Sequence, residues 1–253
     1  MTDFDRNDPA PSRDWSVRLD PEDPEDPEDL AAELSRVARD LEHEEDLQGT
    51  LDAIVGAAVG TVPGAQHASI SMVKGRREVV TSSSTSDLPR KTDQAQYDAG
   101  EGPCLDVLYQ RRTVHVPDMA TEKRWPGFSL AASRLGAGSM LSVQLFVDGD
   151  DLGALNLLSE SPHAFTQDSE QVALLFAAHA AVAIVGAEKE EQLRDALVRR
   201  DVIGQAMGIV MERYGLTAKR SFSVLTRLSQ HRNLKLHDLA RHIVETRALP
   251  EQR

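Results

Sequence analysis

The sequence of 253 residues predicts an α+β domain built on an antiparallel sheet, followed by an all-α module of three helices that a continuous helix joins to it. Between residues 67 and 159, apolar residues recur at every second position in short runs separated by turn residues, as in antiparallel strands. From residue 168 onward, apolar residues recur at helical spacing. These two periodicities divide the chain into a mixed domain and a helical module.

The charge of the chain changes near the same boundary. Residues from Arg194 onward contain 12 Lys or Arg and 6 Asp or Glu, a net charge of +6, so with a total of −13 the first 193 residues carry −19. A basic module after an acidic body indicates a polyanionic partner, or else two domains that attract each other.

Residues 1–29 form an acidic leader that ends in PEDPEDPED. Proline at every third position blocks a helix, and the acidic side chains repel one another, so we expect disorder. The leader is either a solubilising tail or a competitor with nucleic acid for the basic module.

The body, residues 30–187, shows the following elements. Two helices, or one broken near Gly49, are expected over Leu30–Glu45 and Gln48–Val62, and a hairpin turning at Gly75 follows. Thr81–Ala95 is expected to be a polar loop. The remaining elements are short helices over Cys104–Arg111 and Ser129–Leu135, strands over Thr113–Val116, Ser139–Val147 and Leu152–Ser159, and a helix over Asp168–Gly186 capped by Thr166. This order predicts helices on one side of the sheet.

The C-terminal module, residues 188–253, begins within the long helix, because the linking segment Gly186–Ala196 holds no helix breaker beyond Gly186. The first of its three helices is expected over about Glu188–Tyr214, ended by Gly215. The second is expected over Ala218–Gln230, capped by Thr217, with apolar Phe222, Leu225 and Leu228. The third is expected over about Lys235–Arg247, with Leu236, Leu239, Ile243 and Val244 inward.

The stretch Arg199–Tyr214 carries two patterns at once. Leu193, Arg200, Met207 and Tyr214 are seven residues apart and Ala196, Ile203 and Val210 interleave with them, which predicts a parallel homodimer through Asp168–Tyr214. Gly204 and Gly208 each cost a helix about 1 kcal/mol relative to Ala. One turn apart, they allow close approach to the backbone, either by another helix or by a nucleic acid.

Composition excludes several classes of protein. The single Cys104 excludes a disulfide framework and a cysteine-built zinc site and fits a reducing cytoplasm. No apolar run is expected to reach membrane-spanning length, so we expect a soluble cytoplasmic protein. The eight histidines lack HExxH or HxH spacing, and Gly100-Glu101-Gly102 lacks the rest of a nucleotide-binding fingerprint, so no enzyme is expected. Cys104 is either an oxidant sensor or a buried packing residue.

Residues Leu30–Ala187 resemble a GAF domain, a small-molecule sensor fold. The resemblance lies in GEGPC (Gly100–Cys104), VPDM (Val116–Met119), RWPGF (Arg124–Phe128), SVQLFVDGDDLGALNLLS (Ser142–Ser159) and FAAHAAVAI (Phe176–Ile184). It implies a pocket between the sheet and the loops Thr81–Gly102 and Pro117–Arg134, with Gly100, Glu101, Cys104, Trp125 and Phe128 as candidate lining, although Trp125 and Phe128 also suit the core.

The resemblance names no ligand, and no cofactor is expected. A bilin is not expected because Leu105, and not a histidine, follows Cys104. A haem held by His115 or His67 stays an alternative to packing roles for these histidines.

Residues Leu193–Arg247 resemble an ANTAR domain, an RNA-binding antitermination module, and many actinobacterial proteins join GAF to ANTAR in this order. The matching residues include Ile203, the Gln205-Ala206 pair, Gly208, Met211, Gly215-Leu216-Thr217, Phe222, Leu225, Leu228-Ser229, Asn233-Leu234-Lys235-Leu236 and Leu239-Ala240. Two residues depart from the family, which usually has Lys where Met207 stands and Ala where Ser221 stands.

The ANTAR resemblance implies binding to paired stem-loops in nascent RNA, in the context of RNA polymerase, with no membrane partner. Basic groups would hold phosphates, and small polar groups would read splayed loop bases. The candidate RNA-binding residues are Arg200, Gln205, Ala206, Gly208, Arg213, Arg220, Arg227, Ser229, Gln230, Arg232, Asn233 and Lys235.

Three functions are therefore compared. The preferred one is an RNA-binding transcription antiterminator under control of a GAF sensor. The alternatives are a DNA-binding regulator with a GAF ligand sensor, which would prefer duplex DNA to a hairpin RNA, and a ligand-sensing accessory protein that binds neither nucleic acid.

Overall fold

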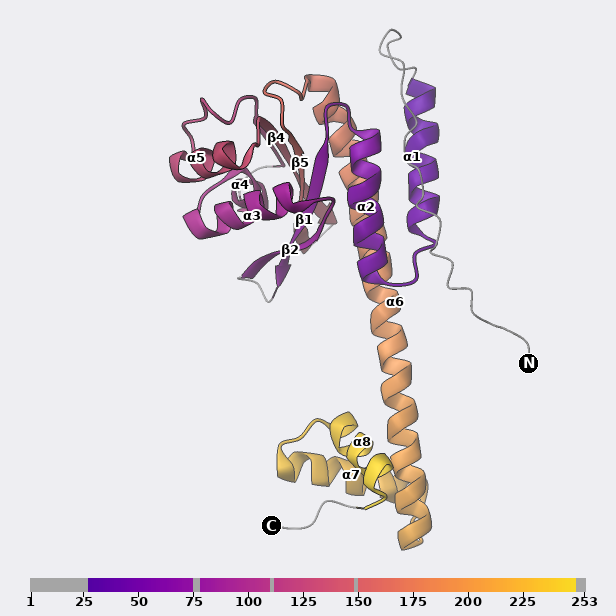
Figure 1. The fold of residues 1–253 in the computed structure, drawn as a ribbon. Helices are drawn as coiled ribbons and strands as arrows, with labels where there is room; N and C mark the ends of the chain where they lie inside the picture. Colours follow the sequence, from indigo (N-terminus) through magenta and orange to yellow (C-terminus); the bar gives the residue numbers. More distant parts are fainter. Residues whose placement is uncertain (1–26, 75–77, 110–111, 148–149, 249–253) are drawn as a thin grey trace, which may run out of the picture. The chain divides into compact units, whose positions relative to one another are not determined.

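A computed structural model describes residues 27–74, 78–109, 112–147 and 150–248, which form two compact units divided between Ala187 and Glu188 (Figure 1). The first unit has an antiparallel sheet with helices, and the second is all helix, as the sequence predicts. The α6 helix, Gln167–Tyr214, is a single element of 48 residues, so the predicted continuous helix is confirmed.

The first unit contains the following elements before α6: α1 Pro27–Leu41, α2 Leu47–Thr61, β1 His67–Lys74, β2 Glu78–Ser84, α3 Asp87–Ala99, α4 Pro103–Tyr109, β3 Thr113–Val116, α5 Pro126–Leu135, β4 Ser139–Val147 and β5 Asp150–Ser159. The strands pair antiparallel in the order β2-β1-β5-β4-β3. The centre of the sheet is β5, whose Leu155 lies opposite Ile70 of β1 and Val143 of β4.

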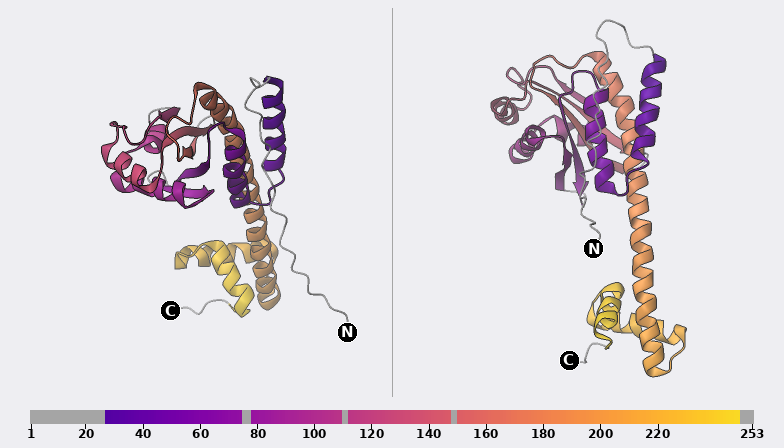
Figure 2. Two further views of the ribbon diagram at one scale, coloured as in Figure 1. Left: turned by 45° about the horizontal axis from the view of Figure 1, so that its top comes forward. Right: turned by 45° about the vertical axis from the view of Figure 1, so that its right-hand side comes forward.

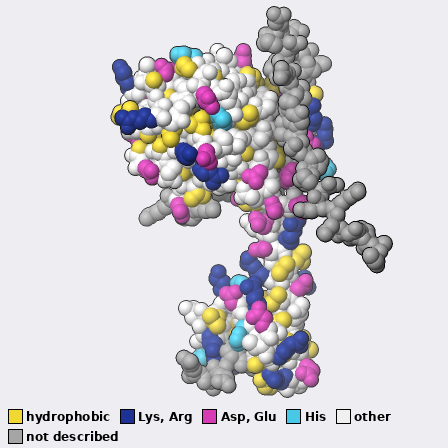
Figure 3. Space-filling model, in the orientation of Figure 1, with side chains coloured by type: hydrophobic (Ala, Val, Ile, Leu, Met, Phe, Trp, Pro, Cys, Tyr) yellow, Lys and Arg dark blue, Asp and Glu magenta, His cyan; other side chains and the backbone are white. Residues whose placement is uncertain are grey.

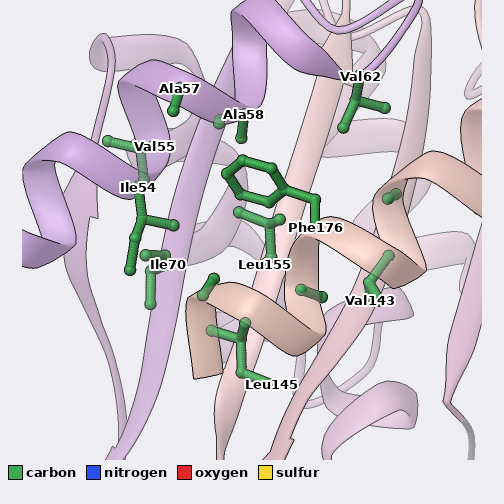
Figure 4. Close-up of a cluster of buried hydrophobic side chains, with 14 of the residues drawn as sticks. Ile54, Val55, Ala57, Ala58, Val62, Ile70, Val143, Leu145, Leu155 and Phe176 are labelled. Atoms are coloured by element: carbon green, nitrogen blue, oxygen red, sulfur yellow. The ribbon is translucent and has the colours of Figure 1, made fainter. Parts of the chain in front are cut away.

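Helices cover both faces of this sheet, so the prediction of helices on one side is wrong. One face packs Ile70, Val143 and Leu155 against α2 and α6 in a core that also holds Phe176 (Figure 4). The other face packs Met140 and other side chains against α4 and α5. The views in Figure 1 and Figure 2 place α2 and α6 on one side of the sheet and α3, α4 and α5 on the other. The strands alternate apolar side chains on the first face with partly polar ones on the second.

Two expected segments differ from the structure. The leader was expected to extend to residue 29, whereas α1 begins at Pro27, because proline fits the first turn of a helix, where the N–H has no helical partner; residues 1–26 lie outside the described part. Thr81–Ala95 is not a loop, since β2 runs to Ser84 and α3 begins at Asp87. The buried face of α3 is mostly polar (Pro89, Thr92, Asp93 and Gln96), so no apolar period marks the helix.

The α6 helix begins and ends where the sequence predicts. Thr166 and Ser169 hydrogen-bond reciprocally, with Ser169 N donating to Thr166 Oγ1 at 3.3 Å and Thr166 N donating to Ser169 Oγ at 3.0 Å. At the other end, Gly215 takes a positive φ of 63°, which a glycine adopts without strain.

In the described residues, α6 is the one helix long and apolar enough to cross a membrane by length and composition, contrary to the sequence expectation. The apolar residues of its first part, among them Val172, Phe176 and Ile184, are buried in the core of the first unit. Burial of this face explains the apolar composition, as in the core helix of a globular domain.

The second unit joins the end of α6 to α7, Ala218–Arg232, and α8, Leu236–Thr246. Thr217 caps α7, because its side chain accepts from Arg220 N, as predicted. The core of the bundle consists of Ala206, Val210, Leu225, Leu239, Ala240 and Ile243.

Candidate functional site

The last third of α6 presents two different faces. Ala206 and Val210 are buried in the bundle core, whereas Gly204 and Gly208 are exposed. A Cβ added at either glycine would meet no described atom within 4 Å. The glycines therefore do not serve packing against α7 or α8, and their bare backbone faces open space.

Two grooves flank Gln205 on this exposed side. One, of about 500 Å³, is lined by Arg200, Asp201, Ile203, Gly204, Gln205, Met207 and Phe222. The other, of about 700 Å³, is lined by Gln205, Gly208, Ile209, Glu212, Arg213, Val244 and Arg247. Each groove combines a glycine, an apolar wall and at least one arginine, a mixture suited to flat rings that carry a nearby negative charge.

Most of the predicted RNA-binding residues lie on the surface of the second unit. Those exposed are Arg200, Gln205, Gly208, Arg213, Arg220, Arg227, Gln230, Asn233 and Lys235, and Arg232 is half-buried. Figure 3 shows Lys and Arg side chains spread over this unit among fewer acidic ones. The exposed cations give the unit a surface that attracts polyanions.

Two of the predicted RNA-binding residues have internal side chains in the second unit. Ala206 is fully buried in the bundle core. Ser229 is buried, and its Oγ donates to the Leu234 carbonyl at 2.6 Å, which closes the turn between α7 and α8. In the same turn Asn233 has φ 52° and ends α7, with its backbone N–H donating to the Ser229 and Gln230 carbonyls.

Some surface residues were missed or misplaced by the sequence reasoning. Phe222, one of the apolar residues of the second predicted helix, is 45% exposed and lines the groove beside Arg200. Arg247 lines the other groove, and its carbonyl accepts from Arg213 Nη1 at 2.6 Å. In the sequence, Arg247 could be noticed only by its position at the end of the last predicted helix. In the structure it ends α8, and its backbone has a φ of 56°.

The predicted seam of α6 divides between two environments. Its first members, Leu193 and Ala196, are exposed. Further along, Ile203 and Met207 are half-buried against the bundle core, and Val210 is inside it. The last member, Tyr214, is exposed again, so only Ile203, Met207 and Val210 of the seam pack in or against the bundle core.

In the first unit, the predicted loop residues hold two helices together. Glu101 Oε1 accepts from Gly127 N at 2.7 Å and from Phe128 N at 3.4 Å, and so satisfies free N–H groups at the start of α5. Gly100 ends α3 with φ 67°. Three of the five candidate pocket residues, Cys104, Trp125 and Phe128, belong to one buried apolar cluster. Cys104 and Phe128 are fully buried, so these three residues pack in the core of the first unit.

The environment of Cys104 opposes a role in sensing oxidants. Burial, and then the negative charge of Asp93, raise the pKa of the Cys104 thiol to about 12. The thiolate is the reactive form, so a thiol held protonated and inaccessible reacts slowly.

A buried polar cluster beside Cys104 was missed by the sequence reasoning. Its centre is Asp93 of α3, whose carboxylate accepts hydrogen bonds from Ser69 at 2.7 Å, Thr81 at 3.0 Å, Asn156 at 3.0 Å and Gln96 at 3.4 Å. The Tyr97 hydroxyl hydrogen-bonds with Ser71 at 2.7 Å and Thr81 at 3.2 Å. The signal in the sequence was the serines at alternate positions of HASISMV and the asparagine within LNLL, which place polar groups on one face of central strands.

Burial dominates the electrostatics of this cluster. It raises the pKa of Asp93 from 3.8 to about 6, although the four hydroxyl and amide groups of Ser69, Thr81, Asn156 and Ser71 act to lower it. Burial and the charge of Asp93 also raise the pKa of the Tyr97 phenol. The cluster therefore holds a carboxyl group whose pKa lies above its ordinary value.

The two histidines considered for haem make other contacts. His67 lies between Ser86 Oγ, 3.0 Å from Nδ1, and Glu160 Oε1, 3.4 Å from Nε2. His115 packs edge-on against Phe165, and its Nε2 is buried without a hydrogen-bond partner in the described structure. Burial lowers the pKa of His115. Among the described residues, no group of three or more His, Cys, Asp or Glu is placed to hold a metal ion.

Comparison with protein families decides what these two units are. The GAF domain model matches residues 44–185, and the ANTAR domain model matches residues 191–244. The chain belongs to the GAF domain family and ends in an ANTAR domain. GAF domains are sensor domains and ANTAR domains are RNA-binding antiterminator domains; neither family is catalytic. The predicted GAF–ANTAR order is thereby confirmed.

Solved structures share the fold of the first unit at low sequence identity. A GAF domain from a phosphoenolpyruvate-protein phosphotransferase of Coxiella burnetii is 18% identical over 64% of this chain and 96% of its own, with a TM-score of 0.50. The phycoerythrobilin-bound GAF domain of a cyanobacterial phytochrome is 12% identical over 64% and 97%, with a TM-score of 0.51. None of the curated proteins matches the chain. At these identities the similarity describes the fold alone.

Proposed function

We propose that this GAF–ANTAR protein is an RNA-binding transcription antiterminator. Its ANTAR domain would bind paired stem-loops in nascent RNA, in the cytoplasm, while RNA polymerase is still transcribing. The observation that carries the proposal is the set of exposed arginines and lysines on an ANTAR domain, in a chain whose remainder is strongly acidic. Because double-stranded RNA hides its base edges, the readable bases are those of the loops.

The phosphate contacts are assigned to exposed basic side chains of α7 and the following turn. Arg220, Arg227 and Lys235 lie there, and Lys235 makes no side-chain cap for α8. Removing its ammonium group therefore leaves the helix start intact. Neutralising one such phosphate contact should weaken binding to all sequences and lower the slope of log affinity against log salt by about 1.

The experiment compares three nucleic acids in gel shifts with the full chain. The probes are a tandem hairpin RNA recovered from RNA that co-purifies with the protein, the same RNA with scrambled loops, and duplex DNA. Tight, salt-dependent binding to the first probe supports the proposal. Preference for duplex DNA favours the DNA-binding alternative, and binding to none of the three favours the accessory protein.

We assign the sensor function to the side of the sheet that carries α3, α4 and α5. The candidate residue Cys104 meets the polar cluster there, because its thiol lies against Ser71 and Asn156. Gly100 ends α3, and Glu101 binds the first turn of α5. A ligand entering between α3 and α5 would compete with the Glu101 contact to Gly127. A thermal-shift screen of small molecules on the wild type and on Glu101→Ala tests this: a ligand of this site raises the melting temperature of the two proteins by different amounts.

The homodimer predicted from α6 is also part of the proposal. Two ANTAR domains brought together by one dimer would match two stem-loops in one transcript. A monomer at micromolar protein concentration, measured by light scattering, would contradict the homodimer.

A further inference from the structure

The smaller of the two grooves beside Gln205, which we call the Gly204 groove, is formed by α6 and α7 within the second unit. Its volume is about 500 Å³, and its lining consists of Arg200, Asp201, Ile203, Gly204, Gln205, Met207 and Phe222. Spacings of four and three residues place Arg200, Gly204 and Met207 on one face of α6. Phe222 is the lining residue that α7 contributes. One wall of the groove is therefore the surface of α6, and the other is an aromatic ring.

The Phe222 ring is held at the surface by the residue before it. Ser221 Oγ is buried and donates to the Met207 carbonyl at 3.0 Å, so the start of α7 is tied to α6 at the groove. The ring itself stays 45% exposed, and Phe222 and Tyr214 are the two aromatic residues in the sequence of the second unit. An exposed aromatic ring at a fixed position gains free energy by stacking on another flat ring.

Gly204 leaves room for such a flat ring. A Cβ added at Gly204 would meet no described atom within 4 Å, so packing of the bundle does not require glycine there. Glycine is unfavourable inside a helix, and it permits another group to approach the backbone closely. Ile203 and Met207 are half-buried and add apolar surface beside the bare backbone. The groove therefore combines an aromatic wall with space for a ring against α6.

The groove also has three polar side chains, those of Arg200, Asp201 and Gln205, and all three are exposed. Neighbouring Arg199 pairs with Asp195 at 2.9 Å, whereas within the described structure Arg200 makes no ion pair. A guanidinium group binds a phosphate through paired N–H donors. The amide of Gln205 and the carboxylate of Asp201 can bond to acceptors and donors on the edge of a nucleobase. Each part of a nucleotide thus has a complementary group in the groove.

From this geometry we infer that the Gly204 groove binds one nucleotide, with its base against Phe222 and its phosphate on Arg200. Arg200 lies four residues, about 6 Å, along α6 from Gly204, so a ring and its phosphate can be held together. The net charge of +6 from Arg194 onward favours an anionic ligand. The nucleotide is either a free nucleoside monophosphate or an unpaired nucleotide of an RNA, which share this chemistry. The second source rests on the proposed function, and the first does not.

A second copy of the chain is the rival occupant of this groove. Arg200, Ile203 and Met207 also belong to the seven-residue seam from which the homodimer is predicted. A partner helix in the groove would cover Phe222 and exclude a nucleotide. The oligomeric state of each variant is therefore measured by sedimentation together with its nucleotide binding.

Calorimetric titration of the full chain tests the free ligand. The probes are the monophosphates of adenosine, guanosine, cytidine and uridine, and the controls are adenosine and inorganic phosphate, which each carry only part of the ligand. At least one monophosphate should bind saturably and more tightly than both controls. Phe222→Ala and Arg200→Gln should each weaken this binding about tenfold, equal to 1.4 kcal/mol. The matched controls Val224→Ala and Arg199→Gln change exposed residues outside the groove and should leave the binding unchanged.

Filling the groove gives a second test. Gly204→Leu raises helix propensity, and its Cβ meets no described atom, so loss of folding is not expected. The leucine side chain should occupy the space of the ring, and nucleotide binding should fall at least about tenfold.

The nucleotide of an RNA is tested with the tandem hairpin probe, prepared with one loop base removed at a time. At one loop position, removal of the base should weaken binding to the wild type about tenfold and leave binding to Phe222→Ala unchanged, because both changes remove the same stacking contact. Non-additivity of this kind identifies the base that lies on Phe222.

Three results would overturn the inference. The first is that no monophosphate binds more tightly than the controls and no loop position shows this non-additivity. The second is that Gly204→Leu binds nucleotides as the wild type does, and the third is that Phe222→Ala dissociates a dimer while nucleotide binding stays the same. Binding of free nucleotides without binding of RNA would contradict the proposed function and support the groove. Binding of RNA with both nucleotide tests negative would contradict the groove and support the proposed function.

Discussion

The side-chain amide of Asn156 on β5 donates to the Asp93 carboxylate on α3 at a distance of 3.0 Å, inside the first unit. Ser142 Oγ in turn donates to Asn156 Oδ1 at 2.8 Å. Both residues are fully buried, so this contact fastens a polar helix to the centre of the sheet without apolar packing. The same burial makes the ionised form of Asp93 unfavourable.

Asp93 should make the folded state less stable as the pH rises. Its pKa is about 6 in the folded protein against 3.8 for the ordinary group, so the folded state binds the proton more tightly. The contribution of Asp93 to the free energy of unfolding is fully present below pH 3.8 and is lost as the pH rises through about 6. The difference between these two pKa values corresponds to about 3 kcal/mol in the free energy of unfolding.

The measurement is urea unfolding of the wild type and Asp93→Asn between pH 4 and 8. Asparagine keeps an acceptor for Asn156 and a donor for the rotatable hydroxyls of Ser69 and Thr81. The variant should gain stability relative to the wild type as the pH rises. Asp98→Asn removes the same charge from an exposed position of α3, and identical pH profiles for the two variants would refute the assignment.

Gly102→Ala should destabilise the first unit far more than Gly100→Ala. Both glycines have positive φ, 146° and 67°. Only at Gly102 would a Cβ collide, lying 2.4 Å from Gln96 Oε1 and 2.6 Å from its Cγ, and that amide oxygen is bonded to Cys104 N at 2.8 Å. We expect losses of about 3 and about 1 kcal/mol in the free energy of unfolding. Equal losses would show that the collision relaxes without cost.

The sequence predicts elements well where apolar residues mark one face. The hairpin of β1 and β2 and the pair β4 and β5 follow from alternation, and α6 follows from its apolar period and its cap at Thr166. The α3 helix could not be predicted this way, because its buried face consists of polar groups that bond to the sheet. Hydrogen bonds between residues that are far apart in the sequence produce no periodic pattern along the helix.

The candidate site residues also differ in how well the sequence predicts their positions. Exposed basic residues of α7 follow from charge and helical spacing alone. The internal roles of Ala206 and Ser229 do not, because a small residue suits a surface and a core equally well, and only the packing of three helices decides.

Ser221→Ala should lower the stability of the second unit slightly. Ser221 Oγ is buried and donates to the Met207 carbonyl at 3.0 Å, so the two residues that depart from the family pattern are bonded to each other. Loss of one such bond costs about 1 kcal/mol. Ser223→Ala, which removes an exposed bond to the Lys219 carbonyl, is the matched control and should change the melting temperature less. A more stable Ser221→Ala protein would contradict this role.

Asn233 is expected to read a loop base, and its backbone geometry allows a sharper test than replacement by alanine. Its φ of 52° is unfavourable for alanine by about 1 kcal/mol but free for glycine, and the backbone bonds to Ser229 and Gln230 survive in either variant. Asn233→Gly should therefore melt like the wild type yet lose about 1–3 kcal/mol of discrimination between the tandem hairpin and its scrambled-loop form. Arg220→Ala should weaken both complexes alike, because a phosphate contact carries no sequence information. If Asn233→Gly still distinguishes the two RNAs, the asparagine serves only the turn between α7 and α8, and the base-reading side chain must be sought at the grooves beside Gln205.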